Sequence, residues 1–240
     1  MDLTEVIRPE AVDPCCRRAR TYLSVARAVA NRLLLSAEVE DHPAQRDDLL
    51  RSMVVFACAG MDRACKALVE DAFPALARMD ETVEDSLAKF AAQHMSQGPS
   101  LSASAIAQVL LDPRSPRDAL LSEFVKKLTG DSLQSVGQLF KVCAALRVPD
   151  EYFKQHNAQL REVFSARNAI VHEMDITSGA DDTVKENVQR KKRSQDEYVV
   201  MANGALSAAN YLVTATSETI RAARAASPFW SAFEEDEVED

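Results

Sequence analysis

The chain contains little glycine, few aromatic residues and no cysteine pair at metal-binding spacing. Its 240 residues include 6 glycines, and aromatic residues make up 6% of the total. Strands are enriched in aromatic and β-branched residues and their turns in glycine, so a sheet-rich protein is disfavoured. Alanine, leucine, arginine and glutamate are abundant instead, and these residues favour helices. The composition therefore predicts an all-α fold.

The cysteines and histidines give no sign of a disulfide framework or a metal site. Five cysteines form an odd set without a Cys-x-x-Cys pair, unlike the cysteines of disulfide-rich or zinc-binding domains. Cys58 and Cys65 lie on an apolar helical stretch, where we expect them to be packing residues. His42, His94 and His156 are isolated from one another and from the cysteines. We expect neither a metal nor another cofactor.

Long apolar runs are missing as well. No run approaches the roughly 20 residues that a helix needs to cross a bilayer. The opening segment, MDLTEVIRPE, lacks the basic flank and apolar centre of a signal peptide. The unpaired cysteines suit a reducing compartment. We therefore expect a cytoplasmic protein that does not bind a membrane.

The chain has no overall positive charge, since its formal net charge is −9 at pH 7. A protein that coats nucleic acid through a broad positive field is disfavoured, and any contact with nucleic acid must be local. Basic residues concentrate in RRAR (residues 17–20) and RKKR (residues 190–193), whereas acidic residues concentrate in the terminal EEDEVED.

Helical apolar spacing, separated by proline and polar turns, recurs along the chain. Asp13 and Pro14 have the character of a helix start, and Pro74 is expected to break the chain after a long buried helix. The predicted helices before the central loop at Pro149 span about residues 15–40, 45–73, 75–95, 102–111, 117–128 and 132–146.

A long last helix is expected to start at Thr183, which has capping-box spacing with Glu186. From Val199 to Ile220, apolar and small residues alternate three and four positions apart, as in helical bundles. No repeat or linker divides the chain, so residues 1–240 are predicted to form one domain. The acidic tail at 228–240 is either a solvated segment or a regulatory one that competes with a polyanion for a basic groove.

One arginine stands in an apolar stripe. If a helix is assumed around Leu160, an apolar face forms from Val163, Phe164, Ile170, Val171 and Met174. Arg167 falls near the middle of this face, which is costly unless its charge is paired or the stripe opens onto a polar cleft. One interpretation pairs Arg167 with Glu70 or Asp71; another lets its stem follow the core while its head reaches water.

The string that follows offers a further interpretation. Arg167, Asn168, Ala169, Ile170, Val171 and His172 stand at the end of an expected helix. This stretch resembles the R-x4-6-H motif of the HEPN superfamily, with the polar residue that often follows the arginine. The helix MVVFACAGMDRACKALVED (residues 53–71) resembles the early HEPN helix that packs beside the motif helix. The similarity covers about residues 45–226, and it is closest to HEPN-like nucleases of prokaryotic toxin and phage-defence systems.

The resemblance implies a metal-independent endoribonuclease that acts as a homodimer, with two motifs meeting at the interface. Arg167 and His172 point about 140° apart on a straight helix, so they need not converge within one chain. His172 is suited to take a proton from the 2′-hydroxyl or to give one to the leaving oxygen. Arg167 is suited to stabilise the phosphorane, and Asn168 to orient the histidine or bind a phosphate.

The basic run Arg190, Lys191, Lys192 and Arg193 is a candidate RNA contact that binds phosphates without reading bases. Its alternative is a solvated helix turn balanced by nearby acidic residues. Other functions remain open as well: a non-catalytic HEPN-type module that binds a nucleotide, RNA or a partner protein, or a helical adaptor in which Arg167 is structural. A cognate antitoxin or sensor protein is an expectation from the family alone.

Overall fold

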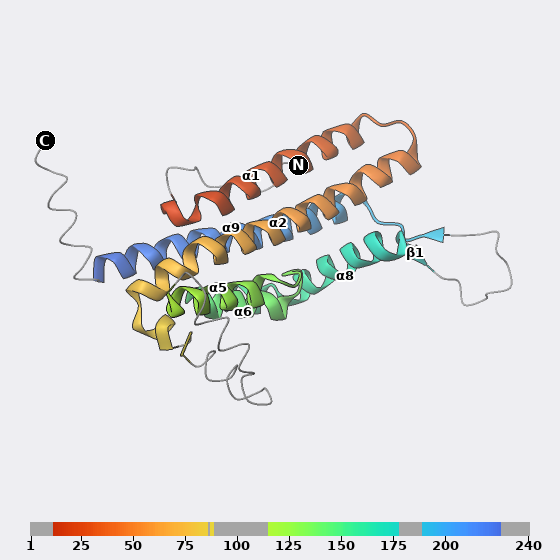
Figure 1. Ribbon diagram of the computed structural model, residues 1–240. Helices are drawn as coiled ribbons and strands as arrows, with labels where there is room; N and C mark the ends of the chain where they lie inside the picture. The colour runs from red at the N-terminus through yellow and green to blue at the C-terminus, as the bar shows by residue number, and fades with distance from the viewer. Residues whose placement is uncertain (1–11, 86, 89–114, 178–188, 227–240) are drawn as a thin grey trace, which may run out of the picture.

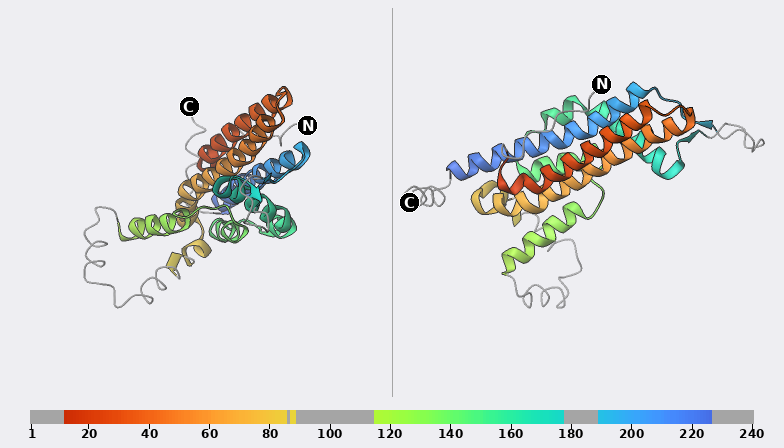
Figure 2. Two further views of the ribbon diagram at one scale, coloured as in Figure 1. Left: turned by 90° about the vertical axis from the view of Figure 1, so that its right-hand side faces the viewer. Right: turned by 90° about the horizontal axis from the view of Figure 1, so that it is seen from above.

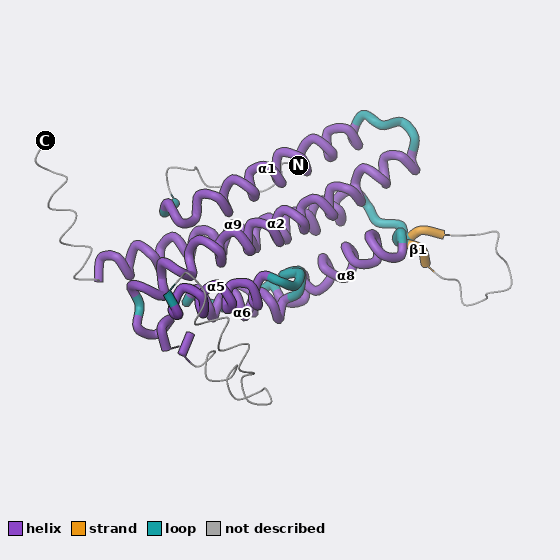
Figure 3. The backbone as a smooth tube through the Cα atoms, viewed as in Figure 1, coloured by secondary structure: helices purple, strands orange, loops and turns teal. Residues whose placement is uncertain are grey.

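The computed structural model describes residues 12–85, 87–88, 115–177 and 189–226 (Figures 1 and 3). This part of the chain is helical apart from one pair of two-residue strands, as the composition predicted. Its elements are η2 (Pro14–Cys16), α1 (Arg17–Glu38), α2 (Pro43–Met79), α5 (Pro116–Thr129), α6 (Val136–Leu146), α7 (Glu151–Gln155), α8 (Asn157–Glu173), β1 (Ile176–Thr177), β2 (Gln189–Arg190) and α9 (Gln195–Ala226). No helix in these ranges is long and apolar enough to span a membrane.

The long helices α1, α2 and α9 lie side by side along most of their lengths (Figure 2). Helix α1 runs opposite to α2, because Arg18 near its start contacts Glu70 and Asp71 near the end of α2. Helix α9 runs in the same direction as α2 and ends beside the start of α1, where Arg224 pairs with Asp13. The shorter helices α5, α6 and α8 cover the other side of α2 (Figure 1).

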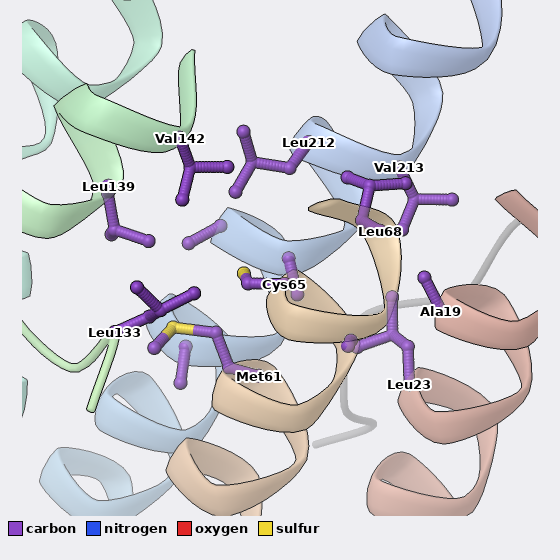
Figure 4. Close-up of a cluster of buried hydrophobic side chains, with 14 of the residues drawn as sticks. Ala19, Leu23, Met61, Cys65, Leu68, Leu133, Leu139, Val142, Leu212 and Val213 are labelled. Carbon is purple, nitrogen blue, oxygen red and sulfur yellow. The ribbon is translucent and has the colours of Figure 1, made fainter. Parts of the chain in front are cut away.

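The core lies on both sides of α2, whose apolar residues are buried in two directions. Figure 4 shows Leu68 of α2 and Leu23 of α1 on one side, and Met61 of α2 near Leu133 on the other. Helix α1 approaches α2 very closely at Gly60, where an added Cβ would lie 2.0 Å from the Cβ of Ala26. Only glycine permits this crossing, since a side chain there would force the two helices apart.

The predicted break at Pro74 is wrong, because α2 continues through the proline to Met79. The turn beyond Pro74 buries Leu76 and Ala77, and the ring of Phe73 stacks on Phe124 of α5 with centroids 4.4 Å apart. Proline in a helix interior usually costs about 3 kcal/mol, and this burial offsets the loss. The helix ends at Met79, with Asp80 as its C-cap, and residues 81–85 are helical again. The predicted helix at 102–111 lies outside the described residues.

The predicted helix from Thr183 through the basic run is also wrong. Thr183 and Glu186 lie outside the described residues, but residues 189–190 form strand β2 and residues 191–194 are not helical. Helix α9 instead begins after Ser194, which forms the capping box with Glu197: the Ser194 backbone N–H donates to the Glu197 carboxylate at 2.6 Å, and the Glu197 N–H donates to Ser194 Oγ at 3.3 Å. This backbone contact holds the pKa of Glu197 below its usual value.

Candidate functional site

Helix α8 carries Arg167, Asn168 and His172 on its last two turns, near the β1–β2 end of the bundle (Figure 1). Arg167 is half-buried, whereas Asn168 and His172 are exposed. The Arg167 Nη1 donates to Asn168 Oδ1 at 2.9 Å. The Arg167 Nε is buried and makes no hydrogen bond within the described part of the chain.

The guanidinium of Arg167 is not neutralised by the carboxylates that the sequence suggested. Glu70 and Asp71 pair with Arg18, and Glu70 also pairs with Arg63. Within the described ranges no acidic side chain forms a salt bridge with Arg167. Its head lies near Cys58 of α2, whose thiol pKa is raised to about 12 by burial while the positive charge of Arg167 acts in the opposite direction. Arg167 therefore brings to the contact between α2 and α8 a positive charge that no acidic side chain of the described ranges pairs with.

His172 lies on a different side of α8 from Arg167. Helix α8 is continuous from Asn157 to Glu173, so residues five positions apart keep their angular separation of about 140°. One side chain faces α2 and the other faces solvent. A single chain therefore does not bring the arginine and the histidine together.

The apolar stripe of α8 is buried only along its first half. Val163 and Phe164 are buried, as predicted, and Ile170 is partly covered. Val171 is 39% exposed and Met174 is 57% exposed, so the prediction of one continuous buried face is wrong at its end. The reason is that α8 reaches the edge of the bundle, where the first turns of α2 cover only one flank of it.

A pocket of about 260 Å³ lies on that flank, between the first half of α2 and the end of α8. We call it the α2–α8 pocket. Its apolar wall comes from Val55, Phe56, Ile170 and Met174, and its polar side comes from Asp48, Arg51, Ser52 and Arg190. It is smaller than the roughly 300–1,000 Å³ that drug-sized ligands occupy. Its size suits one or two side chains of another polypeptide.

A buried aspartate ties this end of the bundle together. Asp175 follows α8 in a left-handed backbone conformation, with φ of 59°, and is 2% exposed. Its Oδ2 accepts a hydrogen bond from Arg51 Nε at 3.2 Å and another from Arg193 Nη1. Its backbone carbonyl accepts from the Lys191 N–H at 2.8 Å. We call Asp175, Arg51 and Arg193 the Asp175 cluster; it joins α2, the end of α8 and the basic run.

The four residues of the basic run have two different environments. Arg193 is buried in the Asp175 cluster, and Arg190 forms a salt bridge with Asp48 beside the pocket. Lys191 and Lys192 are exposed. The run is thus not the solvated helix turn of the alternative interpretation, because β2 pairs with β1 and places Arg190 opposite Ile176. Two lysines, not four basic residues, are available at the surface for phosphates.

Sequence analysis missed Arg51 and Asp175. Arg51 stands three and seven positions before Val54 and Cys58 on the buried stripe of α2, so its position was as unusual for an arginine as that of Arg167. Asp175 had a weaker signal: aspartate tolerates the left-handed conformation that often ends a helix. Neither signal shows that Arg51 and Asp175 are each other's partners, because the two residues lie 124 positions apart in the sequence.

Within the described ranges, no group of three or more histidine, cysteine or acidic side chains is placed to hold a metal ion. Cys16, Cys58, Cys65 and Cys143 are buried, and burial raises the pKa of each thiol. Such thiols are protonated at neutral pH and are poor nucleophiles and metal ligands.

Comparisons with known proteins give no relative for this chain: no family model, no curated protein and no solved structure matches it.

Proposed function

We propose that the protein is a HEPN-like, metal-independent endoribonuclease of the toxin or phage-defence type, in which Arg167, Asn168 and His172 carry the reaction. The observation that supports this most is the state of Arg167. Its guanidinium is half-buried and bonded to Asn168, with no acidic partner among the described residues. A buried arginine with a purely structural role is usually paired with a carboxylate. An unpaired one is ready to bind an anion such as a phosphate.

The chemistry follows from what RNA supplies itself. Its 2′-hydroxyl attacks the adjacent phosphorus once a base removes the proton, and the imidazole of His172 is exposed and able to do so. The forked donors of Arg167 stabilise the negative charge that develops on the phosphorane oxygens. Asn168, held by Arg167, orients that guanidinium or bonds a phosphate oxygen. The bond to the 5′-oxygen then breaks, which leaves a 2′,3′-cyclic phosphate and a 5′-hydroxyl once that oxygen gains a proton.

The angular separation of Arg167 and His172 requires a second copy in this proposal. If two α8 helices face each other, the Arg167 of one chain and the His172 of the other can meet at one phosphate, and the second histidine can protonate the leaving oxygen. The exposed side chains of Val171 and Met174 give the end of α8 apolar surface for such a contact. Lys191 and Lys192 then add positive charge for the RNA backbone.

The same angular separation favours one alternative, a non-catalytic module. A chain in which the arginine and the histidine never converge can still bind a phosphate of a nucleotide or RNA through Arg167 and Asn168. Such a module binds RNA without cutting it, so cleavage separates the two functions.

The test is cleavage of total RNA in EDTA by the purified chain. We expect cleavage without divalent metal and products that end in 2′,3′-cyclic phosphate. His172→Ala should lower the rate by about 10²–10⁴-fold, because it removes the general base. Unfolding by urea should be unchanged, since His172 is exposed.

His42→Ala is the matched control, because His42 is also an exposed histidine and makes no side-chain cap to α2. It should cleave as the wild type does. Equal cleavage by His172→Ala and the wild type, or a requirement for Mg²⁺, would refute the proposed mechanism. RNA binding without cleavage by the wild type would favour the binding module.

A further inference from the structure

The end of the bundle around the α2–α8 pocket exposes a group of large apolar side chains. Phe56 of α2 is 51% exposed and Met174 is 57% exposed, and both line the pocket. Val171 and Ile176, which precede and follow Met174, are exposed as well. Contiguous apolar surface rimmed by polar groups usually marks a place where another polypeptide binds.

Exposed positive charge lies next to the polar side of this pocket. Arg51 and Arg190 line it with Asp48, which pairs with both of them. Lys191 and Lys192, which follow Arg190, add two exposed positive charges. Two exposed lysines thus lie beside the apolar wall of the pocket, in a chain whose formal net charge is −9. The complementary occupant carries apolar side chains next to several acidic ones.

The chain itself contains such a segment. Residues 227–240 read SPFWSAFEEDEVED, in which Phe229, Trp230 and Phe233 precede a run of acidic residues. Trp230 is the single tryptophan of the chain. Aromatic residues are otherwise scarce, and they are the residues that most often anchor a segment in a pocket.

The length of α9 decides which copy of the pocket this segment can reach. The pocket lies beside the start of α9, because Arg190 lines it and Arg193 contacts Asp175. The 32 residues of α9 then lead away to the far end of the bundle (Figure 1), a length of about 48 Å at 1.5 Å per residue. Trp230 follows Ala226 by four residues, a reach of about 14 Å when fully extended. Trp230 therefore cannot enter the pocket of its own chain.

We propose that residues 227–240 of one copy bind the α2–α8 pocket of a second copy, with aromatic side chains against Phe56 and Met174 and acidic side chains along Lys191 and Lys192. Binding in trans needs no change in the described helices, since the pocket is open. It places a polyanionic peptide beside the end of α8. This inference does not depend on the proposed ribonuclease activity. A tail bound at Met174, Lys191 and Lys192 would exclude the contact between two α8 helices and the RNA contact proposed for the same residues.

Trp230 makes the contact measurable in the full-length chain, since it alone supplies the indole fluorescence. We expect its emission maximum to move to shorter wavelength as the protein concentration rises, in step with an increase in mass by sedimentation. Added salt should shift both changes to higher concentration, because the contact includes opposite charges. Phe229→Ser combined with Phe233→Ser keeps Trp230 as the fluorescent group and should weaken the association of the two copies.

Met174→Glu and Val25→Glu form a matched pair, because Val25 on α1 is 56% exposed and Met174 is 57% exposed. Both add one negative charge to a surface position. Met174→Glu should raise the protein concentration at which half of the change in Trp230 emission has occurred by at least about tenfold, since it places a carboxylate in the apolar contact. Val25→Glu should leave that concentration unchanged. Lys191→Gln combined with Lys192→Gln removes the positive charges and leaves the apolar wall intact. This double variant should also raise the concentration needed for the change in emission.

Three outcomes would overturn the proposal. Emission typical of an exposed indole at every concentration would mean that the segment does not bind. A blue-shifted emission that does not depend on concentration would mean that Trp230 lies against its own chain. Equal behaviour of Met174→Glu and Val25→Glu would mean that Trp230 binds another surface. None of these outcomes bears on RNA cleavage, which is measured separately.

Discussion

The two halves of α8 have the same apolar spacing but different surroundings. In the first half, Leu160, Val163 and Phe164 are buried in the bundle core. Val163 packs against Gly204 of α9, where an added Cβ would lie 3.4 Å from the valine methyl group. In the second half, Val171 and Met174 continue the pattern and remain exposed. Arg167 stands where the covered half meets the uncovered half.

This contrast separates stability from function along one helix. Apolar residues that the bundle covers contribute to folding through the water they exclude. Apolar residues that it leaves uncovered contribute little to folding and are available for contact with another molecule. The histidine and the exposed pocket belong to the second half, and the arginine stands at its start, which is why we place the site there.

The largest effect should come from truncating a side chain in the first half. Phe164→Ala removes a buried ring and should lower the free energy of unfolding by about 3–5 kcal/mol, as large-to-small changes in cores do. Val171→Ala in the second half should change it by less than about 1 kcal/mol, because the valine is already partly in water. Urea denaturation of both variants measures the difference.

A loss of similar size from both variants would contradict the division of α8 in the single chain. A concentration-dependent loss for Val171→Ala would instead show that a second copy covers this half, because association of folded chains stabilises them by mass action. Repeating the denaturation at two protein concentrations distinguishes these results.

A smaller loss of stability is expected at the junction that follows the exposed half. Asp175→Asn removes the negative charge that Arg51 and Arg193 share, and should lower the free energy of unfolding by about 3 kcal/mol, since the buried Arg193 loses its carboxylate partner and Arg51 keeps only Asp48. Asparagine tolerates the left-handed conformation at this position, so the change tests the charge and not the backbone. Asp85→Asn, an exposed aspartate outside these pairs, is the control. Equal stability of both variants would contradict the role of the Asp175 cluster.

Local rules predicted most helices but failed where a long-range contact decided the outcome. The start near Pro14, the buried face of α2 and the packing of Val163 and Phe164 follow from proline placement and apolar spacing. Ser194 and Glu197 have the same spacing as Thr183 and Glu186, so spacing alone could not choose the start of α9. The pairing of β2 with β1 and the bond from Lys191 to Asp175 made that choice.

The candidate site was predictable in part. The position of Arg167 within an apolar stripe could be seen from helical spacing, and its half-burial agrees with that position. The absence of a carboxylate partner for it among the described residues could not be foreseen, because Arg18 and Arg63 take Glu70. The division of the basic run into two paired arginines and two exposed lysines depended on Asp48 and Asp175, which lie far away in sequence.

The most direct test of this account replaces Arg167 by methionine and measures RNA cleavage and urea unfolding on one preparation. Arg167→Met keeps a long apolar stem in the stripe and removes the unpaired charge. We expect cleavage in EDTA to fall by about 10²–10³-fold, because the phosphorane loses its charged donor. We expect the free energy of unfolding to stay within about 1 kcal/mol or to rise, since replacing a buried charge by an apolar side chain is often neutral or stabilising. A loss of about 3 kcal/mol with cleavage retained would contradict the account and make Arg167 a structural residue.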